Sequence, residues 1–197
     1  MTETELAAFC AAITPPDEAA RAAAHAHWAS LAKPLGGLGR LETMLEDAAA
    51  LTGTAELAFS RRAVLVLCAD NGVVAEGVTQ TDASVTATMA GEIAKHRSSV
   101  CRMAARAGAD VFAIDIGMNR RVEGVRDCHT ADGTQNMTKG PAMTRAQAEQ
   151  AIQTGMELAH ECRDAGYRLL ATGEMGIGNT TTSSAVTAVL LGLPIEE

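Results

Sequence analysis

The strongest constraint on the fold is a set of short apolar runs separated by longer, helix-like segments. The first run is AVLVLCA at 63–69, and DVFAIDIG at 110–117 and YRLLAT at 167–172 follow it. Continuous branched apolar runs are typical of strands buried on both faces of a parallel sheet, and parallel strands need crossover connections. The pattern therefore predicts an α/β fold with a doubly wound, Rossmann-like parallel sheet. Its helices are expected at about 85–107, at 145–165 and from about 180 onward.

The N-terminal part of the chain has a helical pattern instead. Thr14 and the prolines after it predict a helix start with proline in the first turn, and alanines continue this helix to Leu31. The glycine-rich stretch KPLGGLGRLE at 33–42 interrupts the periodicity, and a second helix is expected over 41–51. We therefore expect a helical segment at 1–52, which is part of a small second domain, and a Rossmann-like domain at 53–197.

Charge and composition exclude several classes of partner. The net charge is -8, and Arg61-Arg62 and Arg120-Arg121 are isolated pairs, so no nucleic-acid partner is expected. No apolar run reaches the length of a membrane span, and the N-terminus MTETELAAFC lacks the pattern of a signal peptide. The five cysteines lack disulfide or zinc spacing, and the five histidines lack the spacing of metal ligands. We expect a cytoplasmic protein without a membrane or metal site.

The stretch GEMGIGNTT at 173–181 is the clearest candidate for a binding turn. It lies between a predicted strand and a predicted helix, where glycines expose backbone N–H groups and the helix N-terminus favours an anion. It has neither the lysine of a Walker loop nor the third glycine of a dinucleotide fingerprint. Turn chemistry alone leaves two equal alternatives, which are a phosphate site and a tight turn with Thr180 as its helix cap.

Carboxylates recur where the predicted strands end. Asp70 precedes Asn71-Gly72, Asp115 lies near Gly117, and Glu174 follows Gly173. Ligands of open α/β sheets gather at the carboxyl ends of the strands. These carboxylates can bind ligand hydroxyls or be ordinary loop residues. For a single aspartate the loop alternative is favoured, and the recurrence at three strand ends raises the weight of ligand binding.

Four motifs, taken together and in order, carry a resemblance to a known family. They are KPLGGLGRLE at 33–42, CADNGVVAEGVTQT at 68–81, GTQNMTKGPAMT at 133–144 and GEMGIGNTTTSSA at 173–185. The chain resembles the nicotinate-nucleotide:dimethylbenzimidazole phosphoribosyltransferase family from about Lys33 to its last residue. The resemblance implies transfer of phosphoribose from nicotinate mononucleotide to 5,6-dimethylbenzimidazole, which gives α-ribazole 5′-phosphate and nicotinate. It also implies a homodimer and no metal or organic cofactor.

The resemblance assigns roles to residues of these motifs. Gly176, Gly178, Asn179 and Thr180 are expected to hold the 5′-phosphate, and Glu174 is expected to face the ribose or the benzimidazole in a supporting catalytic role. The remaining substrate-binding candidates are Asp70, Asn71, Gly72, Thr79 and Lys139. Many relatives have histidine at the position of Asn71, and a Pro-Gln pair at Asp82-Ala83, so the preferred accepting base stays open.

Relatives continue beyond the position of Glu197 to a glutamate that acts as the general base and to helices of the small domain. We therefore expect this chain to be an N-terminal portion with an incomplete Rossmann-like domain, little transferase activity of its own and an exposed apolar sheet edge. The alternative is a non-catalytic nucleotide-binding module or regulatory subunit with the same turn. An NAD-dependent oxidoreductase is disfavoured because the third glycine is missing.

Overall fold

The computed structural model describes residues 2–194, which form two compact units. One unit is Thr2–Phe59, and the other begins at Ser60. The first contains the helices α1 (Glu3–Ala11), α2 (Glu18–Ser30) and α3 (Arg40–Thr52).

Helix α2 begins later than the sequence predicts. Its N-cap is Asp17, whose Oδ1 accepts the N–H groups of Ala19 at 2.9 Å and Ala20 at 3.0 Å. The prediction that the prolines lie in the first turn is therefore wrong, because Pro15 and Pro16 precede the cap. The Asp17 carboxylate satisfies two N–H groups that a proline cap cannot, so the helix begins after it.

The glycine-rich stretch between α2 and α3 is held by one buried carboxylate. Glu42 Oε1 accepts hydrogen bonds from Lys33 Nζ and from the Leu38 N–H, both at 2.9 Å. The ammonium of Lys33, more than the Leu38 N–H, lowers the pKa of Glu42. The motif KPLGGLGRLE therefore has a local structural role, in which its first and last residues close the loop.

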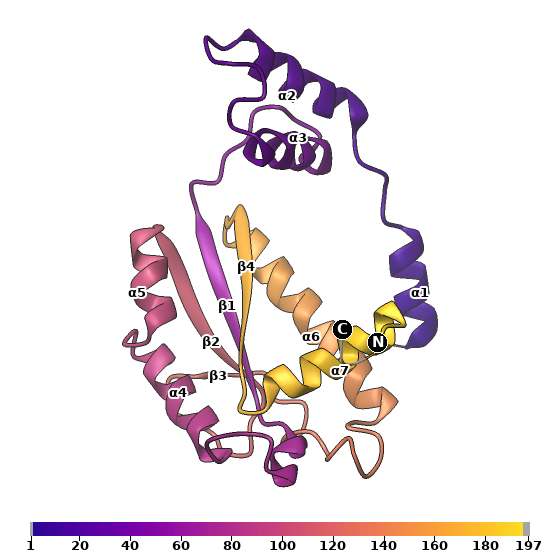
Figure 1. Cartoon of the computed structure of the whole chain (residues 1–197), viewed down its shortest axis with the longest axis vertical. Helices are drawn as coiled ribbons and strands as arrows, with labels where there is room; N and C mark the ends of the chain where they lie inside the picture. Colours follow the sequence, from indigo (N-terminus) through magenta and orange to yellow (C-terminus); the bar gives the residue numbers. More distant parts are fainter. Residues whose placement is uncertain (1, 195–197) are drawn as a thin grey trace. The chain divides into compact units, whose positions relative to one another are not determined.

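The second unit is built on a four-stranded sheet (Figure 1). Its strands are β1 (Arg62–Ala69), β2 (Ala109–Gly117), β3 (Arg126–Asp127) and β4 (Leu169–Met175). Their order is β3-β2-β1-β4, and every neighbouring pair is parallel. Strand β1 is central, which explains why its sequence is a continuous apolar run.

Helices cover both faces of the sheet, which confirms the predicted doubly wound fold. On one face, Val66 and Cys68 of β1 pack with residues of α4 (Ser84–Ala94) and α5 (Ser99–Arg106). On the other face, Leu65 packs with Leu158 and Cys162 of α6 (Arg145–Asp164). Thr144 forms the predicted capping box of α6 with Gln147. Alternate residues of β1 therefore serve two separate cores.

The single helix predicted over 85–107 is wrong, because the segment folds as α4 and α5. Between them, His96 has φ +56°, a left-handed conformation that ends an α-helix. Glycine usually occupies such a position and would have indicated the break. The histidine carries no such signal, so the apolar periodicity continues through the break in sequence.

The last strand begins later than predicted, and the helix after it begins close to its predicted position near Thr180. Strand β4 starts at Leu169 rather than at Tyr167 and continues to Met175, so Glu174 lies within the strand. After a short turn, α7 runs from Asn179 to Leu191. None of its side chains is buried, and Val189 and Leu190 are 81% and 78% exposed. Across residues 2–194, no helix has both the length and the apolar character that a bilayer crossing requires.

Because the thiol of Cys68 is buried, we expect the free energy of unfolding to fall as the pH rises above 9. Cys68 is fully buried, and this burial raises its pKa from 9.0 to about 11. In unfolded protein the thiol ionises first, so its contribution is complete below pH 9 and is lost as the pH approaches 11. We expect urea unfolding to show a loss of about 2 kcal/mol over this interval. The variant C68A should show a shallower decline, and an identical slope would contradict the assignment.

Candidate functional site

The carboxyl ends of β1, β2 and β4 come together at one edge of the sheet. The register pairs Cys68 of β1 with Asp115 of β2 and with Met175 of β4. The segments that follow these strands contain most of the sequence-predicted site residues. Parallel strands place these segments side by side, although they are far apart in the sequence.

Asn71 joins the segment after β1 to the turn after β4. Its Nδ2 donates to the Ile177 carbonyl at 3.0 Å, and its Oδ1 accepts from the Thr182 hydroxyl at 3.2 Å. The Thr86 hydroxyl of α4, which is fully buried, accepts the Ile177 N–H at 3.1 Å. The glycine turn is thus held from two sides, and Thr86 and Thr182 are contacts that the sequence did not reveal.

Gly72 lies where the polar loop after β2 crosses the end of β1. Its N–H donates to Thr134 Oγ1 at 3.0 Å, and the Thr134 N–H donates to the Asp70 carbonyl at 3.0 Å. A Cβ on Gly72 would lie 2.5 Å from the Thr134 carbonyl oxygen, so a side chain there has no room. Thr134 belongs to the motif GTQNMTKGPAMT, and this motif could have indicated that Thr134 lies at the site. Only Lys139 of the motif was predicted to contact substrate.

Asp70 is a buried carboxylate with one unused oxygen. The side chain is 4% exposed, and its Oδ2 accepts the Asn119 N–H at 2.7 Å. Its Oδ1 is buried and has no hydrogen-bond partner among residues 2–194. A buried acceptor without a partner is costly, so a donor supplied by water or a ligand would be favoured at this oxygen.

A small cavity of about 120 Å³ lies at the same edge of the sheet. Its walls are mainly apolar and include Ala69, Ile116, Ala131, Met143 and Ala151. Thr130 also lines it, and the Oγ1 of this residue is buried without a partner among the described residues. None of Asn71, Gly72 and Thr79, which were predicted to line the base pocket, borders this cavity.

The side chain of Asp115 forms hydrogen bonds that stabilise the turn after β2. It is 2% exposed, and its Oδ1 accepts the N–H groups of Gly117 at 2.9 Å and Met118 at 2.8 Å. Arg121 Nη1 donates to its Oδ2 at 3.0 Å. These contacts occupy both oxygens, so Asp115 shapes the turn after β2 and has little capacity left for a ligand hydroxyl.

Glu174 and Asn179 are direct partners. Asn179 Nδ2 donates to Glu174 Oε1, and Asn179 Oδ1 accepts the Thr180 N–H at 2.9 Å. The side chain of Asn179 therefore links the carboxylate to the first turn of α7. The negative charge of Glu174 lies close to a helix N-terminus, where the helix dipole stabilises an anion.

Several backbone N–H groups of the glycine turn already donate hydrogen bonds within the turn. The Asn179 N–H donates to the Gly176 carbonyl at 3.0 Å, and the Thr182 N–H donates to the Gly178 carbonyl at 3.3 Å. Gly178 has φ +86° and forms the N-cap of α7. A phosphate at this turn would therefore compete with Asn179 for the Thr180 N–H.

Thr79 and Lys139 lie outside this hydrogen-bonded network. The Thr79 hydroxyl donates to the Thr81 carbonyl at 2.7 Å within its own loop. Lys139 Nζ lies 3.2 Å from Glu76 Oε1, and its side chain is 71% exposed. Hydrogen bonds from Asn136, and then the contact with Lys139, lower the pKa of Glu76. Among residues 2–194, no group of three potential metal ligands comes together.

The contacts of Asn71 predict a local effect on dynamics. In N71A, the turn loses hydrogen bonds at Ile177 and Thr182, each of which contributes roughly 1 kcal/mol. We expect faster amide hydrogen exchange over 177–182, measured by mass spectrometry, with unchanged exchange in β2. The control T79A removes a hydroxyl that bonds only within its own loop. Equal exchange in N71A and wild-type protein would show that Asn71 does not hold the turn.

Comparisons with known proteins identify relatives of this chain. The model of a phosphoribosyltransferase family matches residues 13–197. Nicotinate-nucleotide–dimethylbenzimidazole phosphoribosyltransferase of Clostridium acetobutylicum is 42% identical over 170 residues, which are 85% of this chain and 48% of that protein. The corresponding protein of Chlorobaculum tepidum is 41% identical over 189 residues, which are 94% of this chain and 54% of that protein.

A solved structure shows the same fold. The crystal structure of nicotinate-nucleotide-dimethylbenzimidazole phosphoribosyltransferase from Thermus thermophilus superposes with a TM-score of 0.85 at 39% identity. The match covers 90% of this chain and 55% of that chain. The chain thus spans about half the length of the relatives that it matches. By sequence and by fold, it belongs to the nicotinate-nucleotide–dimethylbenzimidazole phosphoribosyltransferase family.

Proposed function

We propose that the carboxyl edge of this sheet binds nicotinate mononucleotide for phosphoribosyl transfer to 5,6-dimethylbenzimidazole. The products would be α-ribazole 5′-phosphate and nicotinate. The observation that supports this best is a pair of contacts at the glycine turn. Asn71 bonds to the backbone of Ile177 and so links two motifs, and Glu174 bonds to Asn179 within the second of them. A carboxylate and a helix N-terminus are thereby held a few residues apart, as a ligand with a sugar and a phosphate requires.

The chemistry of the donor suits such a site. Nicotinate leaves its ribose as a neutral ring nitrogen, so bond breaking builds positive charge on the sugar and needs no strong acid. A carboxylate near the ribose stabilises that charge, and fixed donors on the 5′-phosphate position the sugar. Attack by a benzimidazole nitrogen from the opposite face inverts the anomeric carbon, and the other ring nitrogen must then lose its proton to a base.

The proposal gives each part of the site one role. Gly176, Gly178, Asn179 and Thr180 hold the phosphate, and the Thr180 N–H is released to it when the side chain of Asn179 turns away. Glu174 faces the ribose or the incoming base. Asp70 Oδ1, which lacks a partner among the described residues, accepts a ligand donor. Asn71, Gly72 and Thr79 border the base, and Lys139 adds positive potential.

The first experiment is a calorimetric titration of the 197-residue chain with nicotinate mononucleotide. We expect saturable binding that ribose 5-phosphate weakens by competition and that NAD does not. Failure of nicotinate mononucleotide to bind would contradict the proposal. Adding 5,6-dimethylbenzimidazole and assaying α-ribazole 5′-phosphate by chromatography then separates transfer from binding. Binding without any product would fit both an N-terminal portion of the transferase and a non-catalytic nucleotide-binding module, whereas product formation would exclude the module.

We also propose that the protein is a homodimer. The support is the exposed apolar surface of α7, which includes Val186, Val189 and Leu190. Light scattering after size exclusion should give twice the mass of one chain, and a monomer at all concentrations would contradict this.

A reducing, cytoplasmic location is proposed from the free thiols of Cys10, Cys68, Cys101, Cys128 and Cys162. Thiol labelling of protein extracted under non-reducing, denaturing conditions should find all five unpaired.

A further inference from the structure

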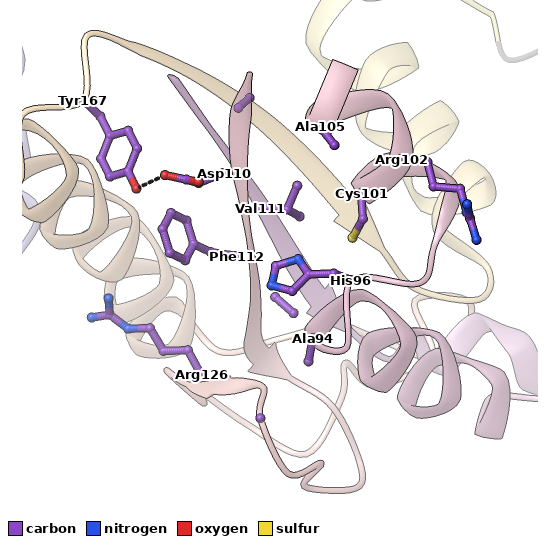
Figure 2. A pocket seen from close by; sticks show the side chains of 13 residues that line it. Ala94, His96, Cys101, Arg102, Ala105, Asp110, Val111, Phe112, Arg126 and Tyr167 are labelled. Atoms are coloured by element: carbon purple, nitrogen blue, oxygen red, sulfur yellow. Dashed lines mark hydrogen bonds between the residues drawn. The ribbon is translucent and has the colours of Figure 1, made fainter. Parts of the chain in front are cut away.

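A groove lies along the amino-terminal half of β2, away from the carboxyl edge that holds the candidate site. Its volume is about 700 Å³, and it follows the strand from Ala109 to Ala113 (Figure 2). Strand β3 pairs with β2 only at Ile114 and Asp115. Among residues 2–194, no strand lies beside Ala109–Ala113 on this side of β2.

The free side of β2 presents backbone donors and acceptors to the groove. The Asp115 carbonyl accepts the Cys128 N–H at 2.9 Å, so the polar groups of Asp115 point toward β3. Because this direction repeats every second residue in a parallel strand, the N–H and C=O groups of Val111 and Ala113 point to the same side. Five residues of strand span about 17 Å, which is enough to pair with one short extended segment.

The two walls of the groove differ in chemistry. Phe112 and Tyr167 lie on one side of β2 and pack edge to face, with ring centroids 5.9 Å apart, and Phe112 is 38% exposed. His96, Cys101 and Arg102 lie on the other side (Figure 2). An extended segment has side chains that alternate between two faces, so one face would meet the aromatic rings and the other the basic wall.

One wall of the groove is basic, whereas the chain as a whole has a net charge of -8. The described residues that line this wall are Ala94, His96, Cys101, Arg102 and Ala105, of which two have basic side chains and none is acidic. Asp110, which also lines the groove, accepts a hydrogen bond from the Tyr167 hydroxyl at 2.5 Å. Arg126 is engaged by Glu161 through two hydrogen bonds, at 2.6 and 2.9 Å. His96 and Arg102 therefore remain on their wall as the groups that favour a carboxylate, and Asp110 keeps its negative charge beside Tyr167 on the opposite wall.

We propose that this groove binds an extended acidic segment of a partner protein, which adds to the sheet beside β2. Main-chain hydrogen bonds to Val111 and Ala113 would supply affinity, as in other cases of strand addition to a sheet edge. Carboxylates on one face of the segment would meet Arg102 and His96, and apolar side chains on the other would cover Phe112. The inference is independent of the nucleotide site, because it uses none of the same residues.

The test uses the whole 197-residue chain and the peptide acetyl-Glu-Val-Glu-Val-Glu-amide. We expect saturable binding, weaker at high salt, with slower hydrogen exchange at Val111 and Ala113 in the complex. R102E should weaken binding about fivefold, which corresponds to roughly 1 kcal/mol. The matched control R106E makes the same charge change on α5, at a residue that does not line the groove, and should leave affinity nearly unchanged.

Several results would overturn the proposal. Equal affinity for acetyl-Lys-Val-Lys-Val-Lys-amide would show that charge does not select the segment. Displacement of the acidic peptide by a single-stranded oligonucleotide would identify a nucleic-acid surface instead. Protection of Val111 and Ala113 that grows with protein concentration, without peptide, would show that a second copy covers the edge. If the peptide does not bind at all, the proposal is wrong. The basic residues would then serve to keep the exposed edge of β2 from pairing with other chains.

Discussion

Replacing Gly176 with alanine is expected to destabilise the protein by about 3 kcal/mol, the upper end of the usual penalty for overpacking. A Cβ at this position would lie 2.3 Å from the carbonyl oxygen of Ala69 and 2.8 Å from Asn71 Nδ2. The first contact is with backbone at the end of the central strand, which cannot move without disturbing the sheet. Urea denaturation of G176A followed by circular dichroism measures the loss.

The chain offers a matched control for this substitution. Gly155 lies within α6, and a Cβ there would meet nothing within 4 Å. Alanine is a better helix former than glycine, so G155A should stabilise the protein by up to about 1 kcal/mol. If G176A unfolds at the same urea concentration as G155A, the tight approach between the turn and β1 is not present in solution.

The second large effect is expected from E174Q, which removes a charge but keeps an acceptor for Asn179. If Glu174 faces the base, its carboxylate accepts the ring N–H of dimethylbenzimidazole, and such charged hydrogen bonds contribute about 1.5 to 3 kcal/mol. We therefore expect E174Q to bind dimethylbenzimidazole about 10- to 100-fold more weakly. Its affinity for ribose 5-phosphate should change little, because the phosphate contacts other residues.

The same titrations also test the alternative that Glu174 repels anions and does not bind the base. The carboxylate lies next to Asn179 at the start of α7, where the negative phosphate is proposed to bind. If Glu174 instead repels anions from this turn, E174Q will bind ribose 5-phosphate more tightly and dimethylbenzimidazole unchanged. N179A provides the comparison, because it frees the Thr180 N–H while the charge of Glu174 remains.

The glycine turn illustrates how a binding motif and a structural motif share residues. Gly176 is required by the approach of Ala69, and Gly178 by its positive φ, before any ligand is considered. Because Asn179 already serves Glu174 and Thr180, the turn is preorganised around its own carboxylate. Phosphate binding at this place therefore involves exchange of partners, which titration of N179A would detect as a change in affinity.

The sequence by itself determined the class of the fold, because its evidence is local. The run at 63–69 is apolar throughout since β1 is buried on both faces, and Thr144 and Gln147 form the expected capping box. These features depend on a few neighbouring residues, so the hydrophobic pattern and the spacing of capping residues are enough to predict them. The order of four short motifs likewise pointed to the family that the comparisons show.

Only the tertiary structure decided which side chains meet. Asn71 and Thr182 are 111 residues apart in sequence, and Glu76 and Asn136 are 60 apart, yet each pair is hydrogen-bonded. Such contacts depend on strand order and on the path of the polar loop, which no local pattern encodes. The helix break at His96 could not be predicted for a related reason. Histidine has no strong preference for a left-handed conformation, so its positive φ depends on the surrounding structure and not on the residue type. The free edge of β2 also emerged only when strand β3 proved to pair with just two of its residues.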